Sequence, residues 1–153
     1  MYLFKTPKIV QNLIPSITWK GNDHKKVVYL TFDDGPIPGV TPWVLDVLKK
    51  FDAKATFFCV GENIDKNPKI FQRILDEGHS VGNHTYNHLD GWITDKDTYL
   101  NNVQKCNRKV NSSLFRPPYG RIGRRQFNSI NKHFEIILWD VLSGDFDPKL
   151  SAD

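Results

Sequence analysis

The stretch YLTFDDGP, residues 29–36, runs from an apolar segment directly into two adjacent aspartates. Its first four residues have the apolar character of a buried strand, and the Gly-Pro pair indicates a turn. Asp33 and Asp34 repel one another unless a cationic group lies beside them. Two interpretations are therefore open: an Asp-rich turn that ends a strand, or one carboxylate that holds a metal ion beside another that handles a proton.

Outward from this stretch, apolar strand-like and helical segments alternate along the chain. Strands are predicted at 27–32, 55–60, 79–83, 113–116 and 135–140, and helices at 41–52, 67–78, 94–110 and 123–132. This alternation predicts an α/β fold with parallel strands, and it leaves an open sheet and a barrel as alternatives.

Composition narrows the class of protein. The 153 residues suit one domain, 39% are hydrophobic and 25% are charged, and the formal net charge is +4, as in a globular protein with no nucleic-acid partner. The basic cluster RIGRRQ, 121–126, is interpreted as a solvated helix start. No apolar run approaches the ~20 residues of a membrane span, and no signal peptide is evident, so a cytoplasmic location is the default expectation. Cys59 and Cys106 are expected to be buried free thiols.

Polar clusters follow four of the predicted strands. Because parallel strands end at one edge of a sheet, and α/β proteins collect their chemistry there, these clusters are predicted to share one rim. The four clusters are Asp33-Asp34, NHTYNH (83–88), RPPYG (116–120) and SGDFD (143–147).

Two histidines in the second cluster suggest a metal site. His84 and His88 are four residues apart, and on a helical turn this spacing would place both imidazoles on one face. With Asp34 on the same rim, two nitrogens and one oxygen suit a catalytic zinc ion with one position open. The same ligands could hold Fe(II) or Co(II), because the set is not specific for zinc.

The second aspartate then acquires a separate role. Asp33 could accept a proton from water at the metal. Arg116, between Phe115 and two prolines, could pair with Asp33, orient it and keep it ionised, which favours a buried position for the arginine.

These motifs together resemble the polysaccharide deacetylase family, the NodB-homology domain of carbohydrate esterases. The resemblance rests on TFDDG, NHTYNH and RPPYG in that order and covers roughly residues 25–147. It implies a distorted (β/α) barrel. The chain divides accordingly into an N-terminal extension, 1–24, packed on a catalytic domain, 25–153.

The resemblance also implies roles for individual residues. Asp33 would be the general base, with Arg116 as its tether. Asp34, His84 and His88 would hold one divalent metal, Zn²⁺ first, with Co²⁺ or another divalent ion also possible. The backbone N–H of Tyr119 would help hold the oxyanion, Asp145 would orient a histidine acid, and Thr85 would brace the loop of the two histidines. Trp139 would wall the acetyl pocket.

Two features depart from the family pattern. Leu142 and Phe146 replace the usual first Asp and the Trp of the fourth motif, which bears on the shape of the substrate groove. No Leu-x-His segment follows Asp145, so the usual acid histidine is missing. The barrel is therefore expected to be incomplete at the C-terminus of this chain.

The expected function is metal-dependent removal of N-acetyl groups from amino sugars of a peptidoglycan- or chitin-like glycan. Trp92 could add a ring that stacks on sugar. Hydrolysis of a small cyclic amide, as in allantoinase-like relatives, is one alternative, and a non-catalytic module that holds metal and binds sugar is another. Fe(II)-dependent oxygenation is a third, which the resemblance disfavours. The oligomeric state is not predicted.

Overall fold

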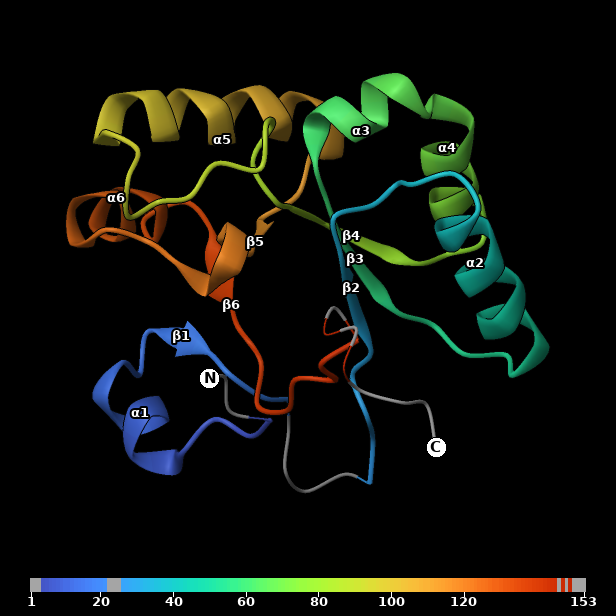
Figure 1. The fold of residues 1–153 in the computed structure, drawn as a ribbon, viewed down its shortest axis with the longest axis horizontal. Helices are drawn as coiled ribbons and strands as arrows, with labels where there is room; N and C mark the ends of the chain where they lie inside the picture. Colours follow the sequence, from blue (N-terminus) through green and yellow to red (C-terminus); the bar gives the residue numbers. More distant parts are fainter. Residues whose placement is uncertain (1–3, 22–25, 146, 148, 150–153) are drawn as a thin grey trace.

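A computed structural model describes residues 4–21, 26–145, 147 and 149 of the chain. Within these residues the strands form one six-stranded sheet (Figure 1). The strands are β1 Ile17–Thr18, β2 Thr31–Asp33, β3 Thr56–Cys59, β4 Ser80–Asn83, β5 Leu114–Phe115 and β6 Glu135–Ile137. The helices are α1 Lys8–Leu13, α2 Val40–Lys50, α3 Gly61–Lys66, α4 Pro68–Asp76, α5 Lys96–Val110 and α6 Arg124–Ile130, with a 3₁₀ turn η1 at Pro118–Gly120.

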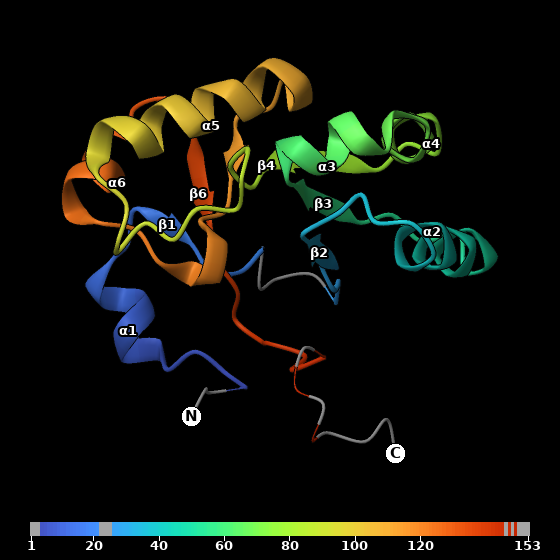
Figure 2. The same ribbon diagram turned by 45° about the horizontal axis from the view of Figure 1, so that its top comes forward.

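All neighbouring strands are parallel, in the order β1-β6-β5-β4-β3-β2. The strands β2 to β6 follow the order of the chain, and each is joined to the next through at least one helix. Figure 2 shows these strands fanning round rather than lying in one plane. The α/β fold with parallel strands, curled in the manner of a (β/α) barrel, is thus confirmed.

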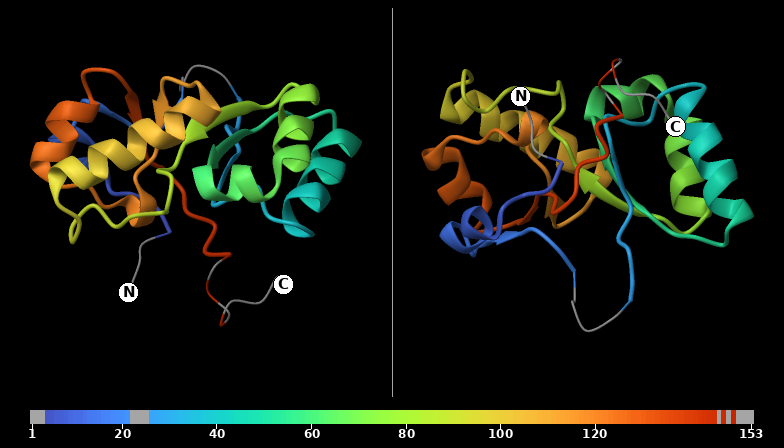
Figure 3. Two further views of the ribbon diagram at one scale, coloured as in Figure 1. Left: turned by 90° about the horizontal axis from the view of Figure 1, so that it is seen from above. Right: turned by 60° about the horizontal axis from the view of Figure 1, so that its bottom comes forward.

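The helices α2 to α6 lie along one side of the sheet (Figures 1 and 3). Beneath them are two apolar clusters. One joins β3 to α2 and α4, and contains Leu45, Phe57 and Ile74. The other joins β5 and β6 to α5 and α6, and contains Tyr99 and Phe115. Burial of these faces stabilises the helices on the sheet and leaves the carboxyl ends of the strands to carry polar side chains.

The predicted strand at 27–32 was wrong in its first half. Residues 26–30 are exposed and lie outside the sheet, and β2 begins only at Thr31. β2 is an edge strand that pairs with β3, so the apolar residues before it find no neighbouring strand among the described residues. Apolar composition alone could not distinguish a strand that pairs in the sheet from an apolar segment that precedes the strand without pairing.

Three short elements were not predicted. β1 has two residues and α1 and α3 have six each, which is too short for a hydrophobic period to be read. β1 extends the sheet beyond β6 instead of preceding β2 in space. The predicted domain boundary, between residues 24 and 25, lies outside the described residues.

Both cysteines are free and buried, as expected. Burial raises the pKa of the Cys106 thiol to about 12 and that of Cys59 still higher, so both stay protonated. In the described part of the chain, no helix has the length and apolar character to cross a membrane.

Candidate metal centre

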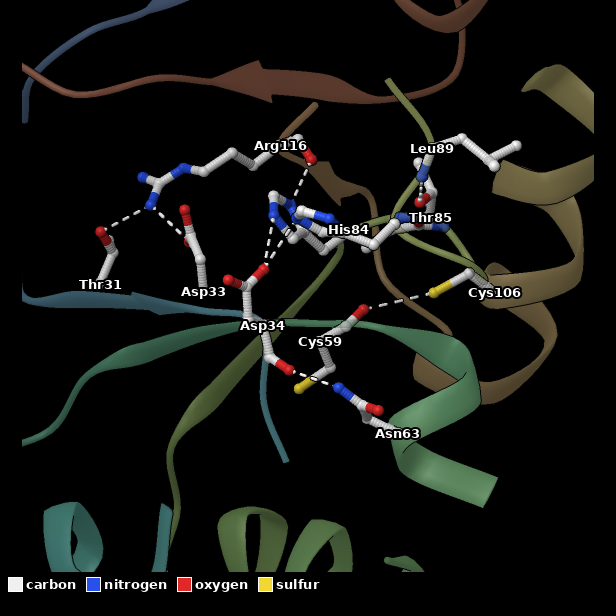
Figure 4. A network of polar contacts seen from close by, with 12 residues as sticks. Thr31, Asp33, Asp34, Cys59, Asn63, His84, Thr85, Leu89, Cys106 and Arg116 are labelled. Atoms are coloured by element: carbon white, nitrogen blue, oxygen red, sulfur yellow. Dashed lines mark hydrogen bonds and ion pairs between the residues drawn. The ribbon is translucent and has the colours of Figure 1, made fainter. Parts of the chain in front are cut away.

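The sheet order brings the functional residues together. Asp34 directly follows β2, His84 follows β4, and Arg116 follows β5. These strands lie within four adjacent positions of the sheet and run in the same direction, so their carboxyl ends share one edge. Figure 4 shows the resulting polar network at that edge.

Asp34, His84 and His88 form the group that could hold a metal ion. One Asp34 oxygen, Oδ1, lies 3.4 Å from His84 Nε2 and 2.9 Å from His88 Nε2. The potential ligand atoms of all three side chains lie within 4.8 Å of one another. Hydrogen bonding, first with His84 and then with His88, holds the pKa of Asp34 well below its ordinary value.

The hydrogen bonding of His84 supports a cation at this position. His84 Nδ1 lies 2.7 Å from the carbonyl oxygen of Arg116, and a carbonyl only accepts, so Nδ1 carries the proton. In the neutral ring, Nε2 then directs a lone pair at the carboxylate of Asp34. Two acceptors in this arrangement require a proton or a cation between them. An imidazole oriented by its other nitrogen is the usual form of a metal-binding histidine.

The donor set and spacing fit a small divalent ion. Zinc binds imidazole nitrogen and carboxylate oxygen at about 2 Å, which places two ligands of one ion roughly 3 Å or slightly more apart. The two Asp34–His separations agree with that spacing. The donors alone do not distinguish zinc from Co²⁺ or Fe²⁺.

The two histidines meet by a route that differs from the predicted one. Residues 84–90 contain no helix, and Thr85 and His88 have positive φ angles of 60° and 55°. The expectation of a helical turn was therefore wrong. The loop reverses sharply, and Thr85 Oγ1 stabilises the turn by accepting the backbone N–H of Leu89 at 3.1 Å.

Buried polar contacts hold this loop in place. Asn83, fully buried, donates to the carbonyl of Val103 on α5 and accepts the N–H of Thr85. At the start of α3, the N–H groups of Gly61 and Glu62 donate to the carbonyls of residues 85 and 86. Helix starts have unpaired N–H groups, so α3 and the loop satisfy one another.

Asp33 faces a different partner from Asp34. Arg116 Nη1 donates to Asp33 Oδ1 at 2.8 Å and to Thr31 Oγ1 at 2.8 Å. The guanidinium also donates to the carbonyls of Ile137 and Leu138, each at 3.2 Å. The arginine therefore ties the carboxyl end of β2 to that of β6.

Arg116 is buried, as the sequence favoured, with 3% of its surface exposed. Its guanidinium carbon lies 4.1 Å from the centre of the Phe58 ring, so the cation is packed as well as hydrogen-bonded. Burial lowers the pKa of Arg116, and the nearby charge of Asp33 opposes that shift. The pair keeps a buried cation beside an acidic group that still reaches solvent.

Tyr119 and Trp139 lie close to this group. The Tyr119 ring packs edge-on against His88 with centroids 4.7 Å apart, and its backbone has a positive φ of 59° in η1. The Trp139 indole lies against the backbone of Gly120, where an added Cβ would come within 2.8 Å of the ring. The oxyanion role of the Tyr119 N–H and the wall role of Trp139 stay predictions.

Arg121 is a residue of this neighbourhood that the sequence analysis did not assign to the site. Its guanidinium lies 5.7 Å from the Tyr119 ring centre and 4.9 Å from that of Trp92. It was interpreted as part of a solvated basic run, because sequence gives no sign that two aromatic rings flank it. Trp92 and Tyr119, which are 27 residues apart in the chain, therefore lie near the same guanidinium.

Asp145 is exposed and accepts a hydrogen bond from Ser143 Oγ at 2.6 Å. Among the described residues, this side chain has no contact with Asp34, His84 or His88, and its orienting role stays a prediction. Phe146 lies outside the described residues.

Comparison with known proteins identifies similar chains. Residues 20–134 match the family model described as polysaccharide deacetylase. A peptidoglycan-N-acetylglucosamine deacetylase of Bacillus cereus is 41% identical over 142 residues, which are 88% of this chain and 51% of the relative. The peptidoglycan-N-acetylmuramic acid deacetylase PdaA of Bacillus subtilis is 35% identical over 134 residues, which are 82% of this chain and 51% of the relative.

Structural comparison agrees. The crystal structure of a peptidoglycan N-acetylglucosamine deacetylase superimposes with a TM-score of 0.75 at 41% identity, over 80% of this chain and 60% of the other. This chain spans about half the length of the curated relatives it matches.

Proposed function

This chain belongs to the polysaccharide deacetylase family, and from that premise we propose that it hydrolyses N-acetyl groups on the amino sugars of a glycan. The products are acetate and the free amine of the sugar. The observation that carries the proposal is that two adjacent carboxylates have different partners. Asp34 faces two imidazoles, whereas Asp33 faces a buried arginine.

We assign the metal to Asp34, His84 and His88, with zinc as the ion of choice. A divalent ion bound there would polarise the acetamide carbonyl and lower the pKa of water toward ~7. The loop that carries the histidines is fixed by buried contacts from α3 and α5, so the ligands need little rearrangement when the ion binds.

Asp33 is the proposed general base. It accepts a proton from the water that attacks the acetamide carbon. The C–N bond then breaks, acetate forms, and the leaving nitrogen takes up that proton to become the free amine. Arg116 holds the Asp33 carboxylate in one orientation, so the base is positioned to accept a proton.

The remaining proposed roles concern the substrate. The Tyr119 N–H donates to the acetamide oxygen as negative charge develops there, a contribution of about 3–4 kcal/mol per donor in other hydrolases. Trp139, packed on Gly120, forms one wall of the acetyl pocket. Asp145 keeps its proposed role of orienting a histidine acid, although no histidine follows it in this sequence.

The names of relatives suggest the kind of glycan. Those compared above are named for N-acetylglucosamine and N-acetylmuramic acid in peptidoglycan. We therefore propose an N-acetylated polysaccharide or oligosaccharide as the substrate.

The test combines metal binding with product release. The chain is freed of metal with a chelator, zinc binding is measured by calorimetry, and acetate is then assayed with purified peptidoglycan and with an N-acetylglucosamine tetramer. We expect one zinc ion per chain and acetate release that disappears with chelator and returns with zinc.

Zinc binding without acetate from either glycan would contradict the deacetylase proposal and support a non-catalytic sugar-binding module. Absence of zinc binding would contradict the assignment of the ligands. The His133→Ala variant, altered at an exposed histidine, serves as the control and should bind zinc normally.

A further inference from the structure

A line of exposed side chains runs outward from the candidate metal centre. The Tyr119 ring contacts His88, the Arg121 guanidinium follows, and Trp92 comes next, with successive separations of 4.7, 5.7 and 4.9 Å. Trp92 is 68% exposed and Tyr119 is 59% exposed. We call Tyr119, Arg121 and Trp92 the aromatic platform. Its two rings expose apolar surface next to the proposed reaction centre.

A single carboxylate ties the two halves of the platform together. Asp90 Oδ2 accepts a hydrogen bond from Arg121 Nη1 at 2.7 Å, and Asp90 Oδ1 accepts the backbone N–H of Trp92 at 2.9 Å. These contacts, the Trp92 N–H first, lower the pKa of Asp90 and keep it ionised. The guanidinium is therefore fixed in position and retains further N–H groups beyond the one bonded to Asp90.

Backbone packing also joins the two segments that carry the platform. A Cβ on Gly91 would lie 2.6 Å from the carbonyl oxygen of Arg121, so only glycine permits this approach. Gln126, which is buried, accepts the N–H of Gly123 and donates to the carbonyl of Thr94, each at 2.8 Å. The loop after β4 and the segment after β5 thus form one rigid unit.

This arrangement has the properties of a sugar-binding surface. An aromatic ring has a negative face, and the C–H groups on one side of a pyranose carry small positive charges that pack against such a face. A guanidinium near two rings also keeps N–H groups that sugar hydroxyls can accept. Fixed side chains bind without losing further conformational freedom.

We infer that the aromatic platform binds a second pyranose ring of the same glycan chain, next to the unit whose N-acetyl group reaches the metal centre. The inference rests on the proposed function and deepens it, because it makes the substrate an oligosaccharide or polymer rather than a single sugar or a small cyclic amide. Arg121 and Trp92 then determine the preference for chain length.

The first experiment measures chain-length preference. Acetate release is assayed with β-1,4-linked N-acetylglucosamine oligomers of two and four units, and kcat/KM for the tetramer is divided by kcat/KM for the dimer. We expect Trp92→Ala and Arg121→Ala each to lower this ratio about tenfold, while Trp92→Phe keeps most of it. The controls are Trp43→Ala, another exposed tryptophan, and Arg125→Ala, another exposed arginine, and neither should change the ratio.

The second experiment does not depend on catalysis. The metal-free chain is titrated with the tetramer while tryptophan fluorescence is recorded, and calorimetry is used for variants that lack Trp92. We expect Trp92→Ala and Arg121→Ala to weaken tetramer binding about tenfold relative to the controls.

The outcomes separate the inference from the function beneath it. An unchanged ratio and unchanged binding in both variants would overturn the platform, even with acetate released normally. Failure of the unaltered chain to release acetate would contradict the proposed function, whereas weaker tetramer binding by Trp92→Ala would still support the platform.

Discussion

Asp33 and Asp34 are adjacent in the chain, yet their carboxylates have different surroundings. Asp33 ends β2 and bonds to Arg116, whereas Asp34 has a positive φ of 68° and faces the two histidines. The carbonyl of Asp34 accepts a hydrogen bond from Asn63 Nδ2 at 2.7 Å, which helps to hold the turn. Each carboxylate therefore has a partner of its own, although the two residues are side by side in the chain.

Matched amides at these two positions should separate their roles. Asp33→Asn should lower kcat for acetate release at least about 100-fold, because a general base is lost, while zinc affinity stays within a few-fold. Asp34→Asn should lose zinc binding, since a neutral amide is a much weaker ligand. Both variants are measured by calorimetry with zinc and by an acetate assay. Equal loss of zinc binding in the two variants would contradict the separate roles of Asp33 and Asp34.

Much at the residue scale could be predicted from sequence. Asp34 and Arg116 were identified because they directly follow predicted strands, and His84 and His88 because they are four residues apart on the same predicted rim. Arg121 was not, because its significance comes from two rings contributed by distant segments. The helical geometry expected for the histidines was wrong, because a four-residue spacing is also compatible with a sharply reversing loop.

Among the elements, β4 shows how a glycine within a strand supports the site. Gly82 lies in β4, and a Cβ there would come within 2.5 Å of the Phe58 ring on β3. That ring, fully buried, is the surface on which the Arg116 guanidinium rests. The missing side chain of Gly82 therefore makes room for the support of the arginine that orients Asp33.

Gly82→Ala should lower the free energy of unfolding by about 1–3 kcal/mol, the usual cost of overpacking a core. The control is Ser80→Ala, an exposed position of the same strand, which should change it by less than about 0.5 kcal/mol. Urea unfolding followed by circular dichroism measures both. Equal stability of the two variants would show that the sheet accommodates the methyl group without strain.

Strand and helix positions were largely predictable, since β3, β4 and the helices α2, α4, α5 and α6 coincide with apolar periods in the sequence. The exceptions have physical reasons. β1 and α3 are too short to show a period, and the apolar residues at 27–30 precede the edge strand without entering the sheet.

At the scale of the whole molecule, the N-terminal segment is part of the sheet. β1 pairs with β6, and Thr6 donates through its N–H and Oγ1 to the carbonyls of Asp140 and Trp139, each at 2.8 Å. Ile17 of β1, only 6% exposed, belongs to the cluster beneath α5 and α6. Residues at the start of the chain therefore position the segment that carries Trp139.

Ile17→Ala should lower the free energy of unfolding by about 2–5 kcal/mol, the range for a large-to-small change in a core. Leu13→Ala is the matched control, because Leu13 is 75% exposed in α1 and should matter by less than about 0.5 kcal/mol. The free energy of unfolding of the two variants, measured in urea, shows whether the N-terminal segment contributes to the stability of the fold. Equal effects would contradict the structural role.

The sequence by itself determined the alternation of strands and helices, the parallel sheet and the residues at its carboxyl edge, because hydrophobic periodicity and strand direction are local properties. Only the tertiary structure decided that β1 joins β6, that the histidines meet across a loop, and that Arg121 lies between Tyr119 and Trp92. Those features depend on contacts between segments distant in the chain. A local sequence pattern does not predict such contacts, because the sequence of each segment is compatible with many different neighbours.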